Sequence, residues 1–143
     1  MPSTAAREVL ESCLCHKVRN AARAVTRAYD NALRPCGLRI TQLSVLVAAA
    51  AEGAVSIAAL ADYMGMDRST LTRNLQPLVG EGLISIGEEG WRRSRTIAIT
   101  KKGADRVQAA LPYWQKAQKA LRETIGAPNW PHVNKSLDQL AGR

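Results

Sequence analysis

The chain has 143 residues, about the size of one domain, which argues against a multidomain enzyme. Lys and Arg total 20 against 12 Asp and Glu, and the net charge of +8 favours an anionic partner, either nucleic acid or an acidic lipid surface. With 46% hydrophobic and 22% charged residues, the composition is that of a folded globular protein and excludes an intrinsically disordered chain.

The sequence predicts no membrane span, cofactor or metal site. The longest strongly apolar run, residues 43–51, is too short to cross a bilayer, and the first residues lack the apolar core of a signal peptide. The three cysteines cannot form a complete disulfide framework. The residues nearest to a zinc set fall short of one: Cys13, Cys15, His16 and His132. We therefore expect a cytoplasmic protein with reduced thiols.

The first predicted element is one long helix over residues 9–33. Its apolar residues recur at steps of three and four, as one stripe of a helix requires: Leu10, Leu14, Val18, Ala21, Val25, Ala28 and Ala32. The opposite face is basic and carries His16, Arg19, Arg23 and Arg27. Pro35 and Gly37 then supply the signal that ends the helix.

Two shorter helices are predicted next, over residues 42–52 and 57–64. Gly53 ends the first of them, and Gly65 with Met66 forms a tight turn after the second. A side chain suited to capping precedes each of three successive helices: Thr41, Ser56 and Asp67.

The helix that follows Asp67 presents two different faces. Four apolar residues are expected to face the core: Leu71, Leu75, Leu78 and Val79. The outward residues offer guanidinium, hydroxyl and amide groups to phosphates and base edges: Arg68, Ser69, Thr70, Thr72, Arg73, Asn74 and Gln76. A solvated helix face usually includes Asp or Glu, and this set has none, so DNA binding is favoured over a merely solvated surface. Pro77 is expected to bend the end of the helix.

A β-hairpin is predicted after Gly82, with strands at residues 83–86 and 95–99 and a polar loop over residues 87–93. Three arginines lie in or beside the loop and suit phosphates or a narrow minor groove: Arg92, Arg93 and Arg95. The alternative is a basic, solvated hairpin tip offset by Glu88 and Glu89, with Trp91 packed under the loop.

The remaining sequence predicts two more helices. Thr100 caps the first, which carries Val107, Ala110, Leu111 and Trp114 and is expected to be bent or interrupted at Pro112. Residues 127–131 separate it from a last amphipathic element that bears Val133, Leu137 and Leu140. The whole order predicts a mainly α fold with a small β-hairpin: a helix-turn-helix whose second helix enters the major groove, followed by a wing.

Ordered blocks along nearly the whole chain resemble the MarR family of dimeric bacterial transcription regulators. They are Thr41-Gln42-Leu43; Ser56-Ile57-Ala58-Ala59-Leu60-Ala61; Met66-Asp67-Arg68-Ser69-Thr70-Leu71-Thr72-Arg73; Leu78-Val79-Gly80-Glu81-Gly82-Leu83-Ile84; and Arg92-Arg93 followed by Ile99-Thr100-Lys101-Lys102-Gly103. The resemblance implies a dimerisation layer made by residues 1–40 and 103–143, a winged helix-turn-helix over residues 41–102, and a homodimer that binds a palindromic double-stranded DNA operator.

The wing departs from the family pattern. The family usually has an Asp just before the arginine pair, where Gly90 and Trp91 stand in this chain. We assign the minor-groove contact to Arg93 and phosphate contacts to Arg92 and Arg95.

The resemblance also implies two kinds of signal, of which cysteine oxidation is the first. Cys15 stands as the cysteine of the organic-hydroperoxide-sensing OhrR branch does, and Tyr29 stands at that branch's thiolate-binding tyrosine. In one helix the two residues would be about 21 Å apart, so they can meet only across a dimer. Cys13 and Cys15 would lie on different sides of an intact helix, which prevents a bond between them. Packing as small hydrophobic residues is the alternative for these thiols.

The second signal is a small aromatic or phenolic effector. Candidate pocket residues are His16, Tyr113 and Trp114, with Tyr29 as a further aromatic side chain. Packing of the two C-terminal aromatics in the dimer layer, and solvation of the histidine, are the alternatives.

The sequence also bears on three other classes of function. The chain lacks a paired-carboxylate set, a nucleophile elbow and a phosphate-binding glycine loop, so we do not expect an enzyme. Membrane attachment is disfavoured because the first helix has a narrow, Ala-rich stripe suited to helix packing. A DNA-binding protein without any sensor stays open. We predict a sequence-specific regulator, expected to be a homodimeric repressor.

Overall fold

The computed structural model describes residues 3–88 and 95–143, and the chain divides into two compact units. The first unit combines Met1–Ala32 with Gln115–Arg143, and the second is Leu33–Trp114. Helices α2 (Leu14–Leu33) and α6 (Lys101–Ile125) each contribute residues to both units.

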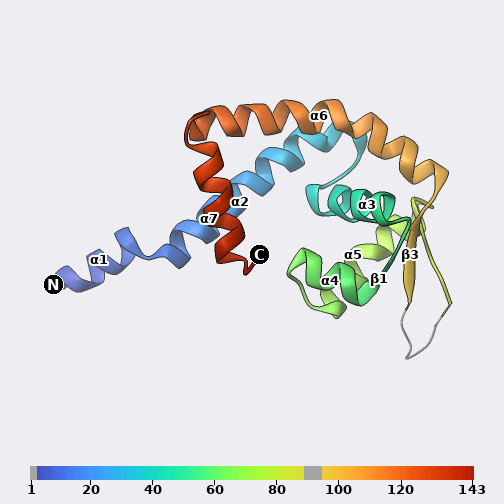
Figure 1. The fold of residues 1–143 in the computed structure, drawn as a ribbon, viewed down its shortest axis with the longest axis horizontal. Helices are drawn as coiled ribbons and strands as arrows, with labels where there is room; N and C mark the ends of the chain where they lie inside the picture. The colour runs from blue at the N-terminus through green and yellow to red at the C-terminus, as the bar shows by residue number, and fades with distance from the viewer. Residues whose placement is uncertain (1–2, 89–94) are drawn as a thin grey trace. The chain divides into compact units, whose positions relative to one another are not determined.

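The second unit consists of helices and a small antiparallel sheet (Figure 1). Besides the start of α6, its elements are η1 (Arg34–Cys36), α3 (Ile40–Glu52), β1 (Ala54–Ser56), α4 (Ile57–Met64), α5 (Arg68–Gly80), β2 (Ile84–Ile86) and β3 (Thr96–Ile99). Strand β3 is central and pairs with β1 on one side and β2 on the other. The predicted order of helix, tight turn, helix and hairpin is confirmed, and β1 is an additional strand.

The core of this unit is built mainly of leucine. Its largest fully buried side chains are Leu33, Leu46, Leu60, Leu71, Leu75, Leu78, Leu83, Ile97 and Val45. Three of the four residues predicted to face the core from α5 do so. Val79 does not, because it lies about 80° around the helix from Leu71, at the edge of the stripe, and it is 38% exposed.

Three of the predicted helix caps are correct and one is wrong. The side-chain oxygens of Ser56, Asp67 and Thr100 accept the backbone N–H of the residue three positions later, at 3.0, 2.8 and 3.0 Å. Thr41 is not a cap, since α3 begins two residues earlier, after Arg39. There the side chain of Gln42 accepts the Arg39 N–H at 2.9 Å.

Neither internal proline ends its helix. Helix α5 continues past Pro77 to Gly80, and α6 continues past Pro112 to Ile125, so of the bend or interruption predicted at Pro112 the interruption does not occur. Proline removes one backbone donor from a helix. In α6 the neighbouring turns are anchored by packing, because Ala110 is buried and Trp114 packs against the core.

The long N-terminal helix is divided in two, which corrects the prediction of one helix over residues 9–33. Helix α1 (Thr4–Ser12) ends at Cys13, whose ψ of 114° is not helical, and α2 begins at Leu14. The Ser12 hydroxyl donates to the Glu8 carbonyl at 2.6 Å, a local bond of the kind that competes with regular helix. No proline or glycine marks this break, so periodicity alone could not reveal it.

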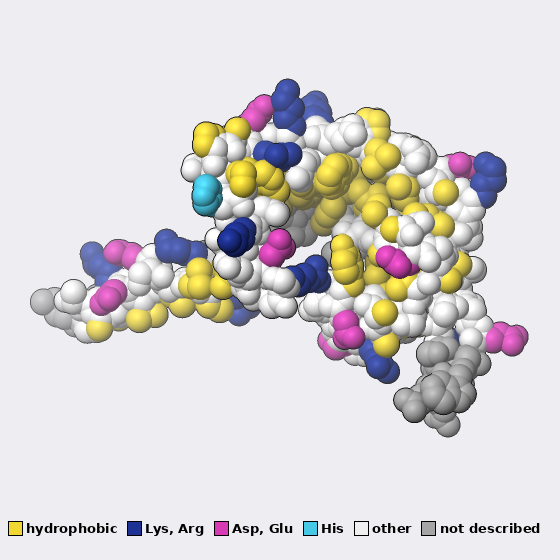
Figure 2. Space-filling model, in the orientation of Figure 1, with side chains coloured by type: hydrophobic (Ala, Val, Ile, Leu, Met, Phe, Trp, Pro, Cys, Tyr) yellow, Lys and Arg dark blue, Asp and Glu magenta, His cyan; other side chains and the backbone are white. Residues whose placement is uncertain are grey.

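The first unit also contains the end of α6 and helix α7 (Trp130–Leu140). The Tyr29 hydroxyl donates to Gln118 Oε1, which joins α2 to α6, and the Arg122 guanidinium lies 5.1 Å from the centre of the Trp130 ring. Yet among the described residues of this unit, Ala117 alone is classed as buried. The large exposed hydrophobic side chains of its described residues are Val9, Leu10, Leu14, Val18, Val25, Leu137 and Leu140. Figure 2 shows such side chains in yellow along α1.

Candidate nucleic-acid interface

The start of α5 is organised by one carboxylate. Asp67 accepts hydrogen bonds from the Ser69 hydroxyl at 2.5 Å, the Thr70 N–H at 2.8 Å and the Thr70 hydroxyl at 2.8 Å. These bonds, that of the Ser69 side chain first, hold the pKa of Asp67 well below its usual range. The ionised carboxylate therefore fixes the orientation of both hydroxyls. Sequence reasoning identified Asp67 as a cap and missed this second role.

The polar residues predicted for DNA contact occupy the sides and the far face of α5, outside its stripe of buried leucines. Five are exposed and two are half-buried, namely Thr70 and Asn74. Arg73 Nη2 lies 3.5 Å from the Thr70 hydroxyl, and the Thr72 hydroxyl donates to the Arg68 carbonyl at 2.8 Å. Helix α5 thus presents two guanidinium groups beside hydroxyls that are already held by local bonds.

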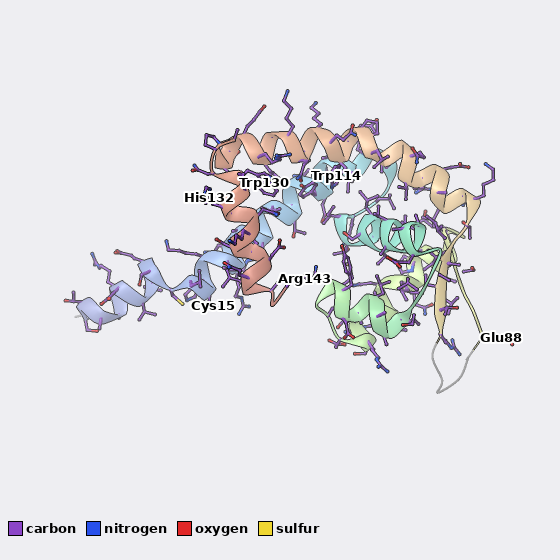
Figure 3. The ribbon with its side chains drawn as sticks, in the orientation of Figure 1. Cys15, Glu88, Trp114, Trp130, His132 and Arg143 are labelled. Carbon is purple, nitrogen blue, oxygen red and sulfur yellow. The ribbon has the colours of Figure 1, made fainter. Side chains whose placement is uncertain are left out.

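The hairpin places Arg95 and Glu88 at its two described edges, and both are exposed. Figure 3 labels Glu88, which lies two residues after the end of β2. The Arg95 carbonyl accepts the Ile57 N–H at 3.0 Å, which ties the hairpin to the start of α4. Arg92 and Arg93 lie outside the described residues, as do Glu89 and Trp91.

A polar cavity of about 360 Å³ lies between the start of α3 and α5. It is lined by Arg39, Thr41, Gln42, Arg73, Asn74 and Pro77. One arginine directly before α3 and one within α5 thus line the same cavity, and its lining includes no Asp or Glu. Sequence reasoning missed Arg39, although an arginine close to the start of the predicted helix-turn-helix is a visible signal.

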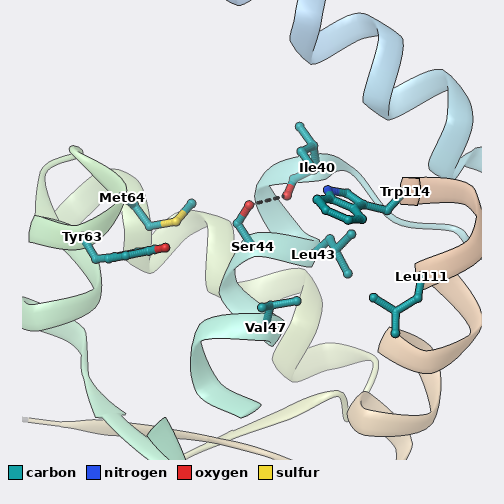
Figure 4. A pocket seen from close by; sticks show the side chains of 8 residues that line it. All are labelled: Ile40, Leu43, Ser44, Val47, Tyr63, Met64, Leu111 and Trp114. Atoms are coloured by element: carbon teal, nitrogen blue, oxygen red, sulfur yellow. Dashed lines mark hydrogen bonds between the residues drawn. The ribbon is translucent and has the colours of Figure 1, made fainter. Parts of the chain in front are cut away.

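An apolar pocket of about 280 Å³ lies between α3, α4 and α6 (Figure 4). Its lining is Ile40, Leu43, Ser44, Val47, Tyr63, Met64, Leu111 and Trp114. Of the predicted pocket residues, Trp114 lines this space. Tyr113 is 41% exposed and does not line it, and His16 belongs to the other unit. The pocket combines α3 and α4 with α6, which is distant from them in sequence, so spacing within one helix could not predict it.

The candidate redox residues lie in the first unit. Cys13 is half-buried at the break between α1 and α2, and Cys15 is exposed in the first turn of α2 (Figure 3). Tyr29 is bonded to Gln118, and burial raises the pKa of its hydroxyl. Within residues 3–88 and 95–143, no group of three His, Cys, Asp or Glu side chains is placed to hold a metal ion. No helix in the same ranges is long and apolar enough to cross a bilayer.

Residues 38–85 match the MarR family. A comparison with curated proteins finds no match. Among solved structures, the transcriptional regulator MosR of M. tuberculosis in complex with DNA is 35% identical to this chain, with a TM-score of 0.83. The alignment covers 92% of this chain and 95% of that chain.

Two further structures share the fold. CouR from Rhodococcus jostii, bound to p-coumaroyl-CoA, is 26% identical with a TM-score of 0.80, and the match covers 92% of this chain and 94% of that chain. A mutant MarR from E. coli, complexed with operator DNA, is 17% identical with a TM-score of 0.82, over 93% of this chain and 96% of that chain. At that identity the likeness concerns the fold alone.

Proposed function

The chain belongs to the MarR family of winged helix-turn-helix transcription regulators, and from that premise we propose that it acts as a homodimeric repressor on a palindromic operator. It is a DNA-binding regulator and not an enzyme. The observation that carries the proposed mode of binding is the face of α5, where seven polar side chains without a carboxylate follow a cap, Asp67, that orients its neighbours.

In this proposal α5 enters the major groove. Specificity comes from Ser69, Thr70, Thr72, Arg73 and Asn74, while Arg68 and Gln76 contact the backbone. From the wing, Arg93 enters the minor groove and Arg92 and Arg95 contact phosphates. Neutralising phosphates makes the affinity strongly dependent on salt.

The first unit supplies the dimer contact. It leaves Leu10 70% exposed and Leu137 50% exposed, and a single chain buries little of its hydrophobic surface there. Large apolar patches on a soluble protein mark interaction surfaces. A second copy that covers them accounts for the pattern and matches the two half-sites of a palindrome.

The decisive experiment measures binding of the purified protein to DNA from its own promoter region and to random DNA of the same length, over a range of salt. Promoter DNA should bind more tightly at every salt concentration. Arg73→Ala should reduce the free-energy preference for promoter DNA over random DNA by about 1–3 kcal/mol, as expected for a lost bidentate base contact. Equal loss on both DNAs would remove Arg73 from the base-reading set.

A small aromatic effector is proposed to bind the apolar pocket and release the DNA. None of the eight lining side chains is Lys, Arg, His, Asp or Glu, so burying a charged ligand would leave its charge without a partner. The Ser44 hydroxyl donates to the Ile40 carbonyl at 2.9 Å, which leaves its oxygen as an acceptor. A cavity of about 150 Å³ holds benzene. The pocket is larger, so it suits an uncharged aromatic molecule of about two rings that carries a phenolic hydroxyl.

A matched pair of probes tests this effector class. 2-Naphthol, which is neutral at pH 7, should bind the protein in calorimetry and weaken DNA binding, whereas anionic 2-naphthoate should do neither. Val47→Trp should fill the pocket and abolish the response, while Ala50→Trp on the same helix should retain it because Ala50 is exposed and does not line the pocket. Equal binding of both probes would contradict the proposed class.

Cysteine oxidation is the second proposed signal, supported by the break at Cys13. Because the helix is interrupted at Cys13, an intact helix does not keep Cys13 and Cys15 on different sides. A hydroperoxide would oxidise one thiol to a sulfenic acid and leave as an alcohol, and a second thiol would then form the disulfide and release water. Peroxide should release wild-type protein from DNA, and dithiothreitol should restore binding. A Cys15→Ser variant that is released equally well would exclude Cys15 as the sensor.

A further inference from the structure

The polar cavity between α3 and α5 brings further hydrogen-bond donors close to the polar face of α5. Arg39, Thr41 and Gln42 line it from the start of α3, and Arg73 lines it from α5. We infer that this cavity binds one phosphate of the DNA backbone and that Arg39 is its main cation. The inference rests on the proposed function, because it assigns a further contact in the same complex.

The donors in the cavity suit a phosphate. A guanidinium group offers N–H donors in a fork that matches phosphate oxygens. Gln42 uses its Oε1 to accept the Arg39 N–H, so its amide nitrogen is left to donate into the cavity. The Thr41 hydroxyl adds another donor. The lining therefore combines two cationic side chains with two neutral donors and has no carboxylate to repel an anion.

Local backbone structure fixes Arg39 at this place. Its φ of −99° and ψ of 158° are extended, and the bond to Gln42 together with the bond from the Leu43 N–H to the Arg39 carbonyl, at 3.0 Å, holds the turn into α3. The side chain therefore starts from a rigid backbone. The partial positive charge at the start of the 13-residue helix α3 adds to that of the arginine.

Arg73 on the opposite wall connects this cavity to the DNA-reading face of α5, where its Nη2 lies near the Thr70 hydroxyl. A phosphate bound by Arg39 is thereby held beside α5, so it would set how far and in which register that helix enters the groove. Arg39 carries no sequence information in this arrangement, whereas the neighbouring α5 residues read bases.

The test replaces Arg39 with glutamine, which keeps a long polar side chain and removes the charge. The control is Lys116→Gln, an exposed residue of α6 that makes the same change in net charge and does not line the cavity. Affinities for promoter DNA and random DNA are measured against salt concentration. Arg39→Gln should weaken both by the same factor and lower the salt slope by about one unit, as expected for one lost phosphate contact. Lys116→Gln should leave slope and affinity unchanged.

A scan with single neutral methylphosphonates locates the phosphate. Each substitution removes one backbone charge from promoter DNA, and one position in each half-site should weaken wild-type binding without weakening Arg39→Gln further. An unchanged salt slope in Arg39→Gln, or a loss confined to promoter DNA, would overturn the inference while the proposed function stands. Wild-type protein that binds no DNA would overturn both. Circular dichroism and the melting temperature verify that the variant is folded.

Discussion

The two units of the chain differ in how much of their hydrophobic surface they bury. Leu33–Trp114 buries leucines from α3, α4 and α5, and β3 lies between two other strands. The other unit has long amphipathic helices, yet Leu10, Leu14 and Leu140 are each more than half exposed. The unit Leu33–Trp114, which we call the DNA-reading unit because the proposed DNA contacts lie in it, therefore has a complete core within one chain. The helical unit is suited to completion by a second copy. A comparable substitution should therefore lower the free energy of unfolding in the first case and weaken dimer association in the second.

The largest expected effect is on the core of the DNA-reading unit. Leu75→Ala removes a fully buried side chain and should lower the free energy of unfolding by about 2–5 kcal/mol. Val79→Ala on the same helix should cost less than about 1 kcal/mol, because that side chain is already partly solvated. Urea unfolding at constant protein concentration measures both. Similar losses for the two variants would contradict the burial described for α5.

The next largest effect on stability is expected at Gly103, where α6 lies close to the backbone of Leu83. A Cβ added at Gly103 would lie 2.0 Å from the Leu83 carbonyl oxygen, so α6 and the chain before β2 would have to move apart. Gly103→Ala should cost about 1–3 kcal/mol or more.

Gly80→Ala is the matched control for that clash. A Cβ at Gly80 meets nothing within 4 Å, and its position at the end of α5 suits alanine. It should leave stability unchanged or raise it by up to about 1 kcal/mol. Equal destabilisation by the two substitutions would mean that the tight contact at Gly103 is relieved elsewhere.

Substitutions in the helical unit should instead change the dissociation constant of the dimer. Leu14 is 57% exposed, and Leu14→Gln should raise the dissociation constant of the dimer at least about tenfold, equivalent to about 1.4 kcal/mol, because it removes apolar surface from both copies. Arg23→Gln, on the basic face, should leave association unchanged. Sedimentation equilibrium over a dilution series measures this. A dimer that is unaffected by Leu14→Gln would place the contact elsewhere.

The parts of the fold that sequence predicted are those fixed by local chemistry. Ser56, Asp67 and Thr100 are caps because a short oxygen-bearing side chain can reach the N–H three residues ahead, and Gly65 has a φ of +65° in the predicted tight turn. The positions that were wrong depend on contacts outside the local segment. Strand β1 has three residues and exists through pairing with β3, and α3 starts early because Gln42 reaches back to Arg39.

The candidate site divides in the same way. The residues of α5 follow from one helical period, so their common face could be predicted. The apolar pocket and the cavity beside Arg39 each need side chains from helices that are distant in sequence, and only Trp114 and the α5 residues Arg73 and Asn74 had been selected among their linings. A pattern within one helix carries no information about which other helix faces it.

The smallest expected effect concerns Asp67, which caps α5 and also orients the Ser69 and Thr70 hydroxyls. Asp67→Ala should lower the melting temperature at pH 7, and Asp67→Asn should lower it less because asparagine also caps helices. Since hydrogen bonds from Ser69 and Thr70 lower the pKa of the carboxyl in the folded protein, its charge stabilises the fold above the ordinary value of 3.8. That stabilisation is lost as the pH falls through the lowered value.

The difference in melting temperature between wild type and Asp67→Ala should therefore stay constant from pH 7 to about pH 5 and narrow below pH 3.8. Thermal unfolding followed by circular dichroism measures it. A difference that stays constant down to pH 2 would mean that ionisation contributes nothing, and that the cap acts through geometry alone. In either case promoter binding at pH 7 should weaken in Asp67→Ala, because the Ser69 and Thr70 hydroxyls lose the acceptor that orients them at the start of the DNA-reading helix.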